Sequence, residues 1–140
     1  MTQDPMHDPM RDPMRDLPAP AAPLVEVSRL QEAVALFARE RDWEPFHSPK
    51  NLAMALTGEV GELVELFQWL SEEASHDVGR DPATARPVRD ELADVLIYLV
   101  RLAAVLEVDL DEAMRSKLAA NALKYPVERA RGNARKHPQR

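Results

Sequence analysis

The chain has 140 residues, 12 of them proline and none cysteine, and its formal net charge is −6. Without cysteine it can form no disulfide, thiolate nucleophile or zinc-thiolate site, which leaves oxygen and imidazole as metal ligands. The acidic balance argues against nucleic-acid binding, because that binding depends on clustered Lys and Arg that neutralise phosphates. A divalent cation suits this composition better.

Two apolar runs are the longest, at residues 95–100 and 102–106, and neither approaches the ~20 residues of a membrane-spanning helix. Aspartates recur near the start, where a secretory signal would have its apolar core. We therefore expect a cytoplasmic protein that does not bind membranes.

Composition divides the chain into three parts. Half of the prolines lie in residues 1–23, where a DPM motif recurs every fourth residue, and proline at this spacing opposes helix formation. We expect this leader to be disordered. Residues 24–126 should form one compact domain. Residues 127–140 form a basic tail, which is either a solvated end or a lid attracted to an anionic ligand.

The domain has few glycines and no alternating strand-like stretch, while apolar residues recur at helical spacing. This pattern predicts an all-α fold with four main helices. The first should run over residues 28–41, with Ser28 as its N-cap. The second should run from Ser48 to about residue 70, because Ser48 can cap free amides and Pro49 suits the first helical position.

A polar, turn-rich stretch at residues 71–84 predicts a surface loop, with a turn after Asp81. The third helix should follow Pro87 and end near residue 107. It is apolar nearly all round, so we expect it to be the most buried helix.

The fourth helix should open at Asp109 as its cap, with Glu112 three positions on, and close before Pro126. Short links favour antiparallel neighbours. The expected architecture is therefore an antiparallel four-helix bundle.

Two pairs of carboxylates have the spacing of a shared site. Glu59 and Glu62 lie three apart on the second helix, and Glu91 and Asp94 lie three apart on the third, so each pair projects from adjacent turns. Solvated helix faces would be the ordinary explanation. Asp94 heads the most apolar stretch of its helix, however, where an unpaired carboxylate is costly to bury. Facing helices would gather four negative charges.

Gathered carboxylates favour a bound cation, because like charges repel. Neither Glu59 nor Glu91 has a histidine three positions later, as di-iron bundles require. All-oxygen sites suit Mg²⁺, with Mn²⁺ as a substitute, and Mg²⁺ commonly bridges carboxylates and substrate phosphates. Gly58 and Gly61 weaken the second helix, which is tolerable if a ligand or another helix approaches closely.

Other candidate ligand contacts are aromatic or basic. Trp43 lies in the loop before the second helix and is suited to stacking on a planar base, while Tyr98 lies one turn after Asp94 and can reach the same ligand. Phe46 and Tyr98 fit core packing equally well. On the fourth helix Lys117, Asn121 and Lys124 are either phosphate contacts or surface residues.

The sequence resembles the MazG-like all-α nucleoside triphosphate pyrophosphohydrolases, whose signature is ExxE, a spacer and ExxD. The stretches RDWEPFHSPKNLAMALTGEVGELVELFQW, ELADVLIYLVRLA and SKLAANALKYP look most like the dCTP pyrophosphatase branch. The likeness covers residues 28–135. Two positions depart from it, because family members often carry histidine where Gln31 stands and arginine where Lys124 stands.

The resemblance implies Mg²⁺ held by four carboxylates, and water attack on the α-phosphorus that releases a nucleoside monophosphate and pyrophosphate. Glu62 and Glu59 are the catalytic candidates, with Glu62 accepting the proton of the water. The implied metal ligands are Glu59, Glu62, Glu91 and Asp94. The implied substrate contacts are Trp43, His47 and Trp69 for the base, Tyr98 for the sugar, and Lys117, Asn121 and Lys124 for phosphate or base.

The expected function is hydrolysis of dCTP, including 5-modified forms, to dCMP and pyrophosphate. Two alternatives stay open: a dUTP or broad-specificity dNTP pyrophosphohydrolase, and a non-catalytic helical regulator that binds nucleotides or a partner. Because a small bundle with much apolar surface favours self-association, we expect a homotetramer built as a dimer of dimers, or a homodimer.

Overall fold

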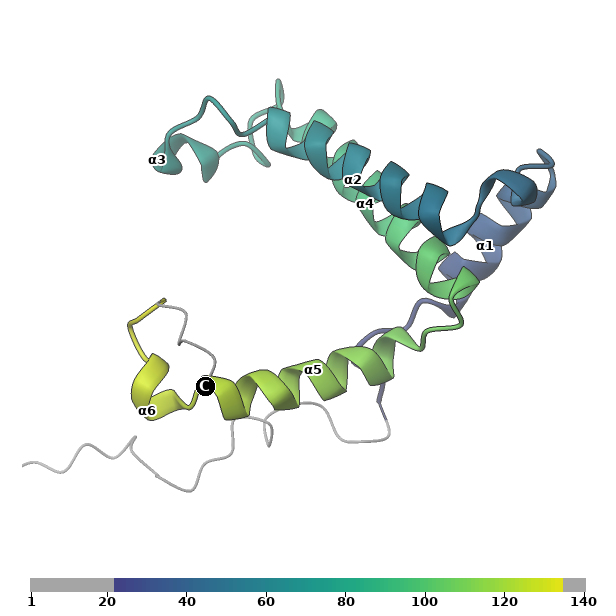
Figure 1. The fold of residues 1–140 in the computed structure, drawn as a ribbon. Helices are drawn as coiled ribbons and strands as arrows, with labels where there is room; N and C mark the ends of the chain where they lie inside the picture. The colour runs from purple at the N-terminus through teal and green to yellow at the C-terminus, as the bar shows by residue number, and fades with distance from the viewer. Residues whose placement is uncertain (1–21, 135–140) are drawn as a thin grey trace, which may run out of the picture. The chain divides into compact units, whose positions relative to one another are not determined.

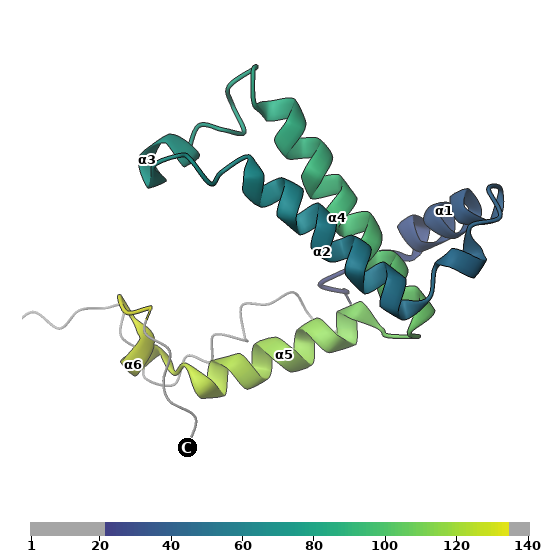
Figure 2. The same ribbon diagram turned by 45° about the horizontal axis from the view of Figure 1, so that its top comes forward.

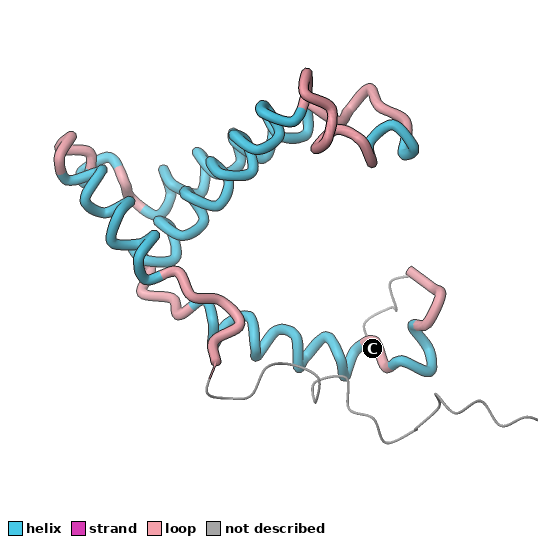
Figure 3. Tube along the Cα trace, turned by 180° about the vertical axis from the view of Figure 1, so that it is seen from behind, coloured by secondary structure: helices cyan, strands magenta, loops and turns pink. Residues whose placement is uncertain are grey.

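The computed structural model describes residues 22–134, which consist of helices, turns and loops (Figures 1 and 3). The all-α prediction is confirmed for these residues. Most of the predicted leader and the end of the predicted basic tail lie outside them. The chain divides into two compact units: Val27–Asp109, and a second unit whose described residues are 22–26 and 110–134. Within residues 22–134, no helix combines the length and apolar character needed to cross a membrane.

The first unit contains a long antiparallel helix pair. Helices α2 and α4 lie side by side and run in opposite directions, and α1 packs against α4 (Figures 1 and 2). This helix pair positions the side chains of the candidate functional site. The elements of the unit are α1 (Ser28–Arg39), the 3₁₀ turn η2 (Glu44–Phe46), α2 (Pro49–Glu65), α3 (Glu72–Ser75) and α4 (Ala85–Val105).

Helix α2 begins as the sequence predicts. The Ser48 hydroxyl accepts a hydrogen bond from the Asn51 amide at 3.2 Å, and Pro49 is the first helical residue. The helix ends at Glu65, five residues earlier than expected. There the amides of Leu66 and Phe67 bond to carbonyls three residues back, so the chain leaves the helix through tighter turns.

Helix α1 ends in a turn that positions Trp43. It begins at Ser28, with Val27 in the cap position, so the predicted N-cap is wrong by one residue. At the other end the Trp43 amide donates to the Ala38 carbonyl at 2.9 Å, and Asp42 has a φ of 53°. This is a Schellman-type ending, which commonly brings its last residue back onto the helix.

The predicted loop at residues 71–84 contains one short helix, α3. The predicted turn at Asp81 is confirmed: its carboxylate accepts from the Ala83 amide at 2.9 Å, and its carbonyl accepts from the Thr84 amide. Helix α4 starts at Ala85, before Pro87, because a proline in the first turn lacks only an amide that would have no helical partner.

The core of this unit lies where three helices meet. Ala38 of α1, Leu52 of α2, and Val100 and Ala103 of α4 are buried. Truncating a buried leucine to alanine typically costs about 2–5 kcal/mol of stability. Helix α4 has the most buried residues of any described helix, as predicted, but one side of it stays exposed in the single chain. The exposed residues on that side are Leu92, Leu96 and Leu99.

The second unit holds α5 (Leu110–Lys124) and α6 (Val127–Ala130), a short helix that the sequence did not predict. Asp111 joins α5 to the segment before α1, because its carboxylate accepts from the amides of Leu24 and Val25 and from Arg115 Nε at 2.9 Å. The Arg115 bond is the main cause that lowers the pKa of Asp111. No residue of α5 is buried, and the four-helix bundle stays a prediction.

Replacing Glu107 with glycine should stabilise the fold. Glu107 lies two residues after the last residue of α4 and has a φ of 56°, while the Val108 amide donates to the Ala103 carbonyl at 2.9 Å. A left-handed conformation is costly for a residue with a side chain but not for glycine. We expect Glu107→Gly to raise the free energy of unfolding by about 0.5–1 kcal/mol in urea titrations at fixed protein concentration.

The matched control is Glu107→Ala, which removes the same charge from the helix end but keeps the Cβ atom. Glu107→Gly should be the more stable of the two variants. Equal stabilities would show that the backbone conformation at this position carries no cost.

Candidate functional site

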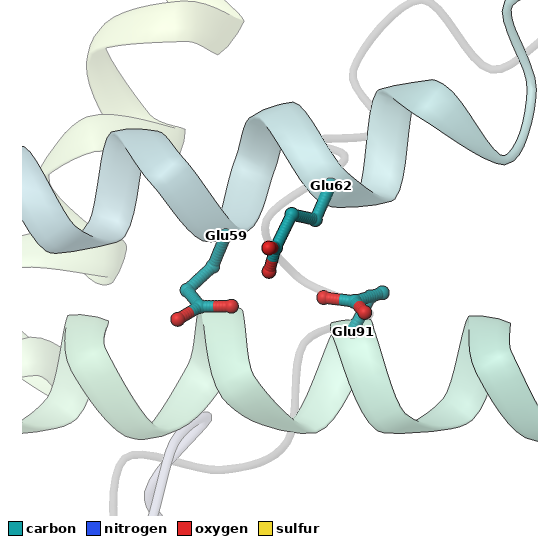
Figure 4. A group of neighbouring side chains, drawn as sticks. All are labelled: Glu59, Glu62 and Glu91. Atoms are coloured by element: carbon teal, nitrogen blue, oxygen red, sulfur yellow. The ribbon is translucent and has the colours of Figure 1, made fainter.

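Three glutamates meet between α2 and α4. Figure 4 shows Glu59 and Glu62 projecting from α2 toward α4, and Glu91 projecting from α4 to meet them. One carboxylate oxygen from each lies within 4.8 Å of the others. The i, i+3 spacing on α2 puts two of these side chains on adjacent turns of one face, and the antiparallel neighbour supplies the third. The predicted meeting of the two carboxylate pairs is thus seen for three of four residues.

The electrostatics of this glutamate cluster favour a cation. Burial raises the pKa of Glu59 most. The hydrogen bond with Glu62 and the negative charge of Glu62 raise this pKa further. Burial also raises the pKa of Glu91, followed by the charges of Glu62 and Asp94. Atom Oε2 of Glu91 is buried without a hydrogen-bond partner. A divalent ion would satisfy that oxygen and neutralise the repulsion, so the residues present fit Mg²⁺ or Mn²⁺.

Asp94 lies beside the glutamate cluster rather than within it. Its side chain is exposed in the single chain, so the expectation that it is buried in the most apolar helix is wrong. Helix α4 turns a different side toward the core at this point. The charge of Asp94 nevertheless raises the pKa of both Glu59 and Glu91, which places it close enough to share their field.

Gly58 and Gly61 flank the cluster on the open side of α2. A Cβ atom built at either position would meet no atom within 4 Å. No described part of this chain therefore approaches the helix there. The close approach that the sequence suggested, by a ligand or another helix, is not made by any described part of this chain and stays a prediction.

A cavity of about 400 Å³ adjoins the cluster, and Asp94 belongs to its wall. Its volume lies in the range of small-molecule sites. Helix α1 supplies an apolar wall with i, i+3, i+4, i+7 spacing, η2 contributes its two flanking residues, and α4 completes the lining. The lining residues are Leu30, Ala33, Val34, Phe37, Trp43, His47, Asp94, Ile97, Tyr98 and Arg101.

Three of the predicted substrate contacts share this cavity. Trp43, His47 and Tyr98 all line it, although they come from two separate parts of the chain. The Trp43 ring packs edge-on against Phe37 with centroids 5.8 Å apart, and lies 6.4 Å from the His47 ring. An apolar wall with aromatic rings and a few polar groups suits a flat, polar-edged ligand such as a nucleobase.

Arg101 is a cavity residue that the sequence reading missed. Its Nε donates a hydrogen bond to Nδ1 of His47 at 3.2 Å. Burial lowers the pKa of His47, the Arg101 charge lowers it further, and Glu44 opposes both. A signal was present, because residues 94, 98 and 101 follow one helical face and Arg101 interrupts an apolar run.

Two other aromatic residues of the first unit do not line the cavity. Trp69 follows α2, is 88% exposed and does not line the cavity, and Phe46 is 67% exposed rather than packed in a core. Lys117, Asn121 and Lys124 lie at i, i+4 and i+7 on α5, in the second unit. Their roles remain predictions.

Comparison with known proteins fits this geometry. A model of the MazG-like family matches residues 55–138, which is more than half of the chain. The chain belongs to the MazG-like family. The matched region contains the whole glutamate cluster and Asp94, and it extends through α5.

Several proteins are similar to this MazG-like chain over most of its length. It is 49% identical to dCTP pyrophosphatase 1 of Mus musculus over 119 residues, covering 85% of this chain and 68% of that protein. The Homo sapiens protein of the same name is 47% identical, with 86% and 69% covered. The chain is also similar to a pyrophosphatase from Archaeoglobus fulgidus of known crystal structure. The two share 39% sequence identity and superpose with a TM-score of 0.66, covering 70% of this chain and 90% of that one.

The stability of the metal-free protein should fall as pH rises from about 4.5 toward neutrality. The pKa values of Glu59 and Glu91 are raised in the fold, so the folded state binds protons more tightly than the unfolded one. Their contribution is complete below the ordinary glutamate pKa and is lost as pH passes the raised values. Thermal unfolding in EDTA across this range measures the slope.

Mg²⁺ should reverse this trend, because it competes with protons for the same carboxylates. We expect the Mg²⁺-induced rise in Tm to grow with pH in the native chain and to vanish in Glu91→Gln. Glu73→Gln on α3 is the control for removing one exposed carboxylate. A rise in Tm that survives in Glu91→Gln would place the ion elsewhere.

Proposed function

We propose that this chain is a cytoplasmic, Mg²⁺-dependent pyrophosphohydrolase that converts dCTP, including 5-modified forms, to dCMP and pyrophosphate. The reaction class rests on its relatives, which are named as dCTP pyrophosphatases and a dATP/dGTP diphosphohydrolase, and the chain is a nucleoside triphosphate pyrophosphohydrolase. One observation carries the proposal within the structure: a buried carboxylate oxygen without a hydrogen-bond partner, in a glutamate cluster beside a largely apolar cavity of about 400 Å³.

The glutamate cluster supplies the metal ligands in this proposal. Glu59, Glu62 and Glu91 hold the ion, and Asp94 completes the set from the cavity wall. When bound, Mg²⁺ supplies positive charge that stabilises the triphosphate and favours ionisation of the attacking water. The same carboxylates would repel a triphosphate without it, so turnover should require the metal.

The residues of this chain position the reacting groups and move one proton. Glu62 is the exposed member of the cluster, which suits it to accept the proton of the attacking water. The water oxygen forms a bond to the α-phosphorus, and the bond from that phosphorus to the bridging oxygen breaks. Pyrophosphate leaves with the bonding electrons, and no covalent enzyme intermediate forms.

The cavity holds the base in this arrangement. Trp43 supplies a ring face for stacking, and Tyr98, one turn from Asp94, is placed to contact the sugar. A base so held would direct its phosphates toward the glutamate cluster. Trp69, Lys117, Asn121 and Lys124 complete the proposed substrate contacts.

The alternative is a broader or different base preference. A dATP/dGTP diphosphohydrolase of Cyanophage S-2L is 39% identical over 61 residues, covering 44% of this chain and 51% of that protein. Related chains thus carry names that specify different bases. Several dNTPs, or dUTP as the sequence left open, are the competing substrates.

Pyrophosphate release from each dNTP separates these possibilities. With Mg²⁺ present, kcat/KM should be highest for dCTP and 5-methyl-dCTP, and EDTA should abolish turnover. A higher value for dUTP, or similar values for all substrates, would establish the alternative. Absence of pyrophosphate from every dNTP would leave a nucleotide-binding regulator and remove the catalytic proposal.

Substitution of Glu62 tests the proton acceptor. Glu62→Gln keeps the shape of the side chain but cannot take a proton, so kcat should fall about 10²–10⁴-fold while the helical circular dichroism spectrum persists. Glu65→Gln removes the same charge from the same helix outside the cluster and should retain activity. Near-native kcat in Glu62→Gln would refute its assigned role.

Self-association belongs to the same proposal. Val60 and Val64 on α2 and the exposed leucines of α4 offer apolar surface, and Gly58 and Gly61 leave α2 open. We expect light scattering to give two or four times the chain mass of 15.8 kDa. Leu96→Asp should reduce that mass. If light scattering gave the mass of a single chain at every protein concentration, both the homotetramer and the homodimer would be contradicted.

A further inference from the structure

Arg101 and His47 meet at the cavity wall although 54 residues separate them. Arg101 extends from α4 and His47 follows η2, so their hydrogen bond connects the two parts of the chain that form this wall. It joins two side chains through specific atoms, Nε and Nδ1, at 3.2 Å in a partly buried setting. The contact therefore constrains the imidazole ring as well as holding the loop.

The direction of this hydrogen bond fixes the chemistry of His47. A guanidinium has only donors and keeps its charge, so Nδ1 must be the acceptor and carry no proton. A neutral imidazole that accepts at Nδ1 carries its proton on Nε2. Of the other charged or titratable groups, Glu44 acts on His47 from η2, and Asp94 and Tyr98 line the same cavity. His47 thus offers a ligand one donor, Nε2–H, and no free acceptor.

We propose that Arg101 is a positioning residue that fixes His47 as an Nε2–H donor and thereby sets the base preference of the cavity. The inference rests on the proposed function for the identity of the ligand. Cytosine carries a free acceptor at N3, whereas uracil and thymine carry a donor N–H at that atom. A fixed Nε2–H donor on the cavity wall can bond to N3 of cytosine. With uracil or thymine the same donor would face the N3–H donor of the base.

The hydrogen bond makes this role different from that of a general positive charge. An imidazole without a fixed partner can present either nitrogen as the acceptor, and so can adapt to an N–H group. Removing Arg101 would restore that freedom. Discrimination arises mainly from the penalty on an unpaired buried polar group, which a flexible ring would avoid.

Nuclear magnetic resonance of the full chain tests the positioning without any turnover. Two-bond proton–nitrogen spectra should show His47, assigned with His47→Gln, as the Nε2–H tautomer between pH 6 and 8. In Arg101→Leu the tautomer should become mixed and the pKa of His47 should rise toward its ordinary value. An Nδ1–H tautomer in the native chain, or an unchanged one in Arg101→Leu, overturns the proposal.

Substrate kinetics test the consequence for base preference. The ratio of kcat/KM for dCTP to that for dUTP should fall at least about tenfold in Arg101→Leu. Arg89→Leu removes the same charge from an exposed position of α4 and should leave the ratio unchanged. A native ratio in Arg101→Leu, with its tautomer lost, refutes the link to specificity. If the native chain hydrolyses no dNTP, the proposed function fails while the tautomer spectra still decide the role of Arg101.

Discussion

Repulsion among three glutamates is the constraint on which this unit depends. Glu59, Glu62 and Glu91 bring carboxylate oxygens within 4.8 Å of one another, and Oε2 of Glu91 is buried without a hydrogen-bond partner. Packing of α2 and α4 around Leu52 and Val100 holds the helices together against this repulsion. A cation that binds only the folded pair gains affinity from the repulsion it removes, so metal binding and folding are coupled.

Local rules made part of the fold predictable. Ser48 and Pro49 mark a helix start because cap and first residue act within one turn. The ends of α1 and α4 could not be located from the sequence. A glycine usually marks the left-handed residue that ends a helix, but here Asp42 and Glu107 take that conformation. Helix α2 ends at Glu65 because the next amides bond to carbonyls three residues back instead of four. The spacing of apolar residues does not reveal this change.

The candidate site was predictable where it follows helix geometry. Spacing alone placed the glutamates on facing turns, and a loop position singled out Trp43. The role of Arg101 was not predicted because its partner, His47, is 54 residues away in the sequence. A single charged residue within an apolar run does not by itself indicate a contact. Burial of Asp94 was wrongly expected because composition does not show which side of a helix faces the core.

The two tryptophans of the chain have different surroundings. Trp43 packs against Phe37 at the cavity, whereas Trp69 is 88% exposed. Indole fluorescence responds to stacked bases and to loss of water, so the two rings would report binding from different starting surroundings. Entry of a base would quench Trp43, and a base or a second chain that covered Trp69 would shift its emission to the blue. A chain with phenylalanine at position 69 would carry a single built-in optical probe at the cavity, and ligand entry could be followed in real time without a label.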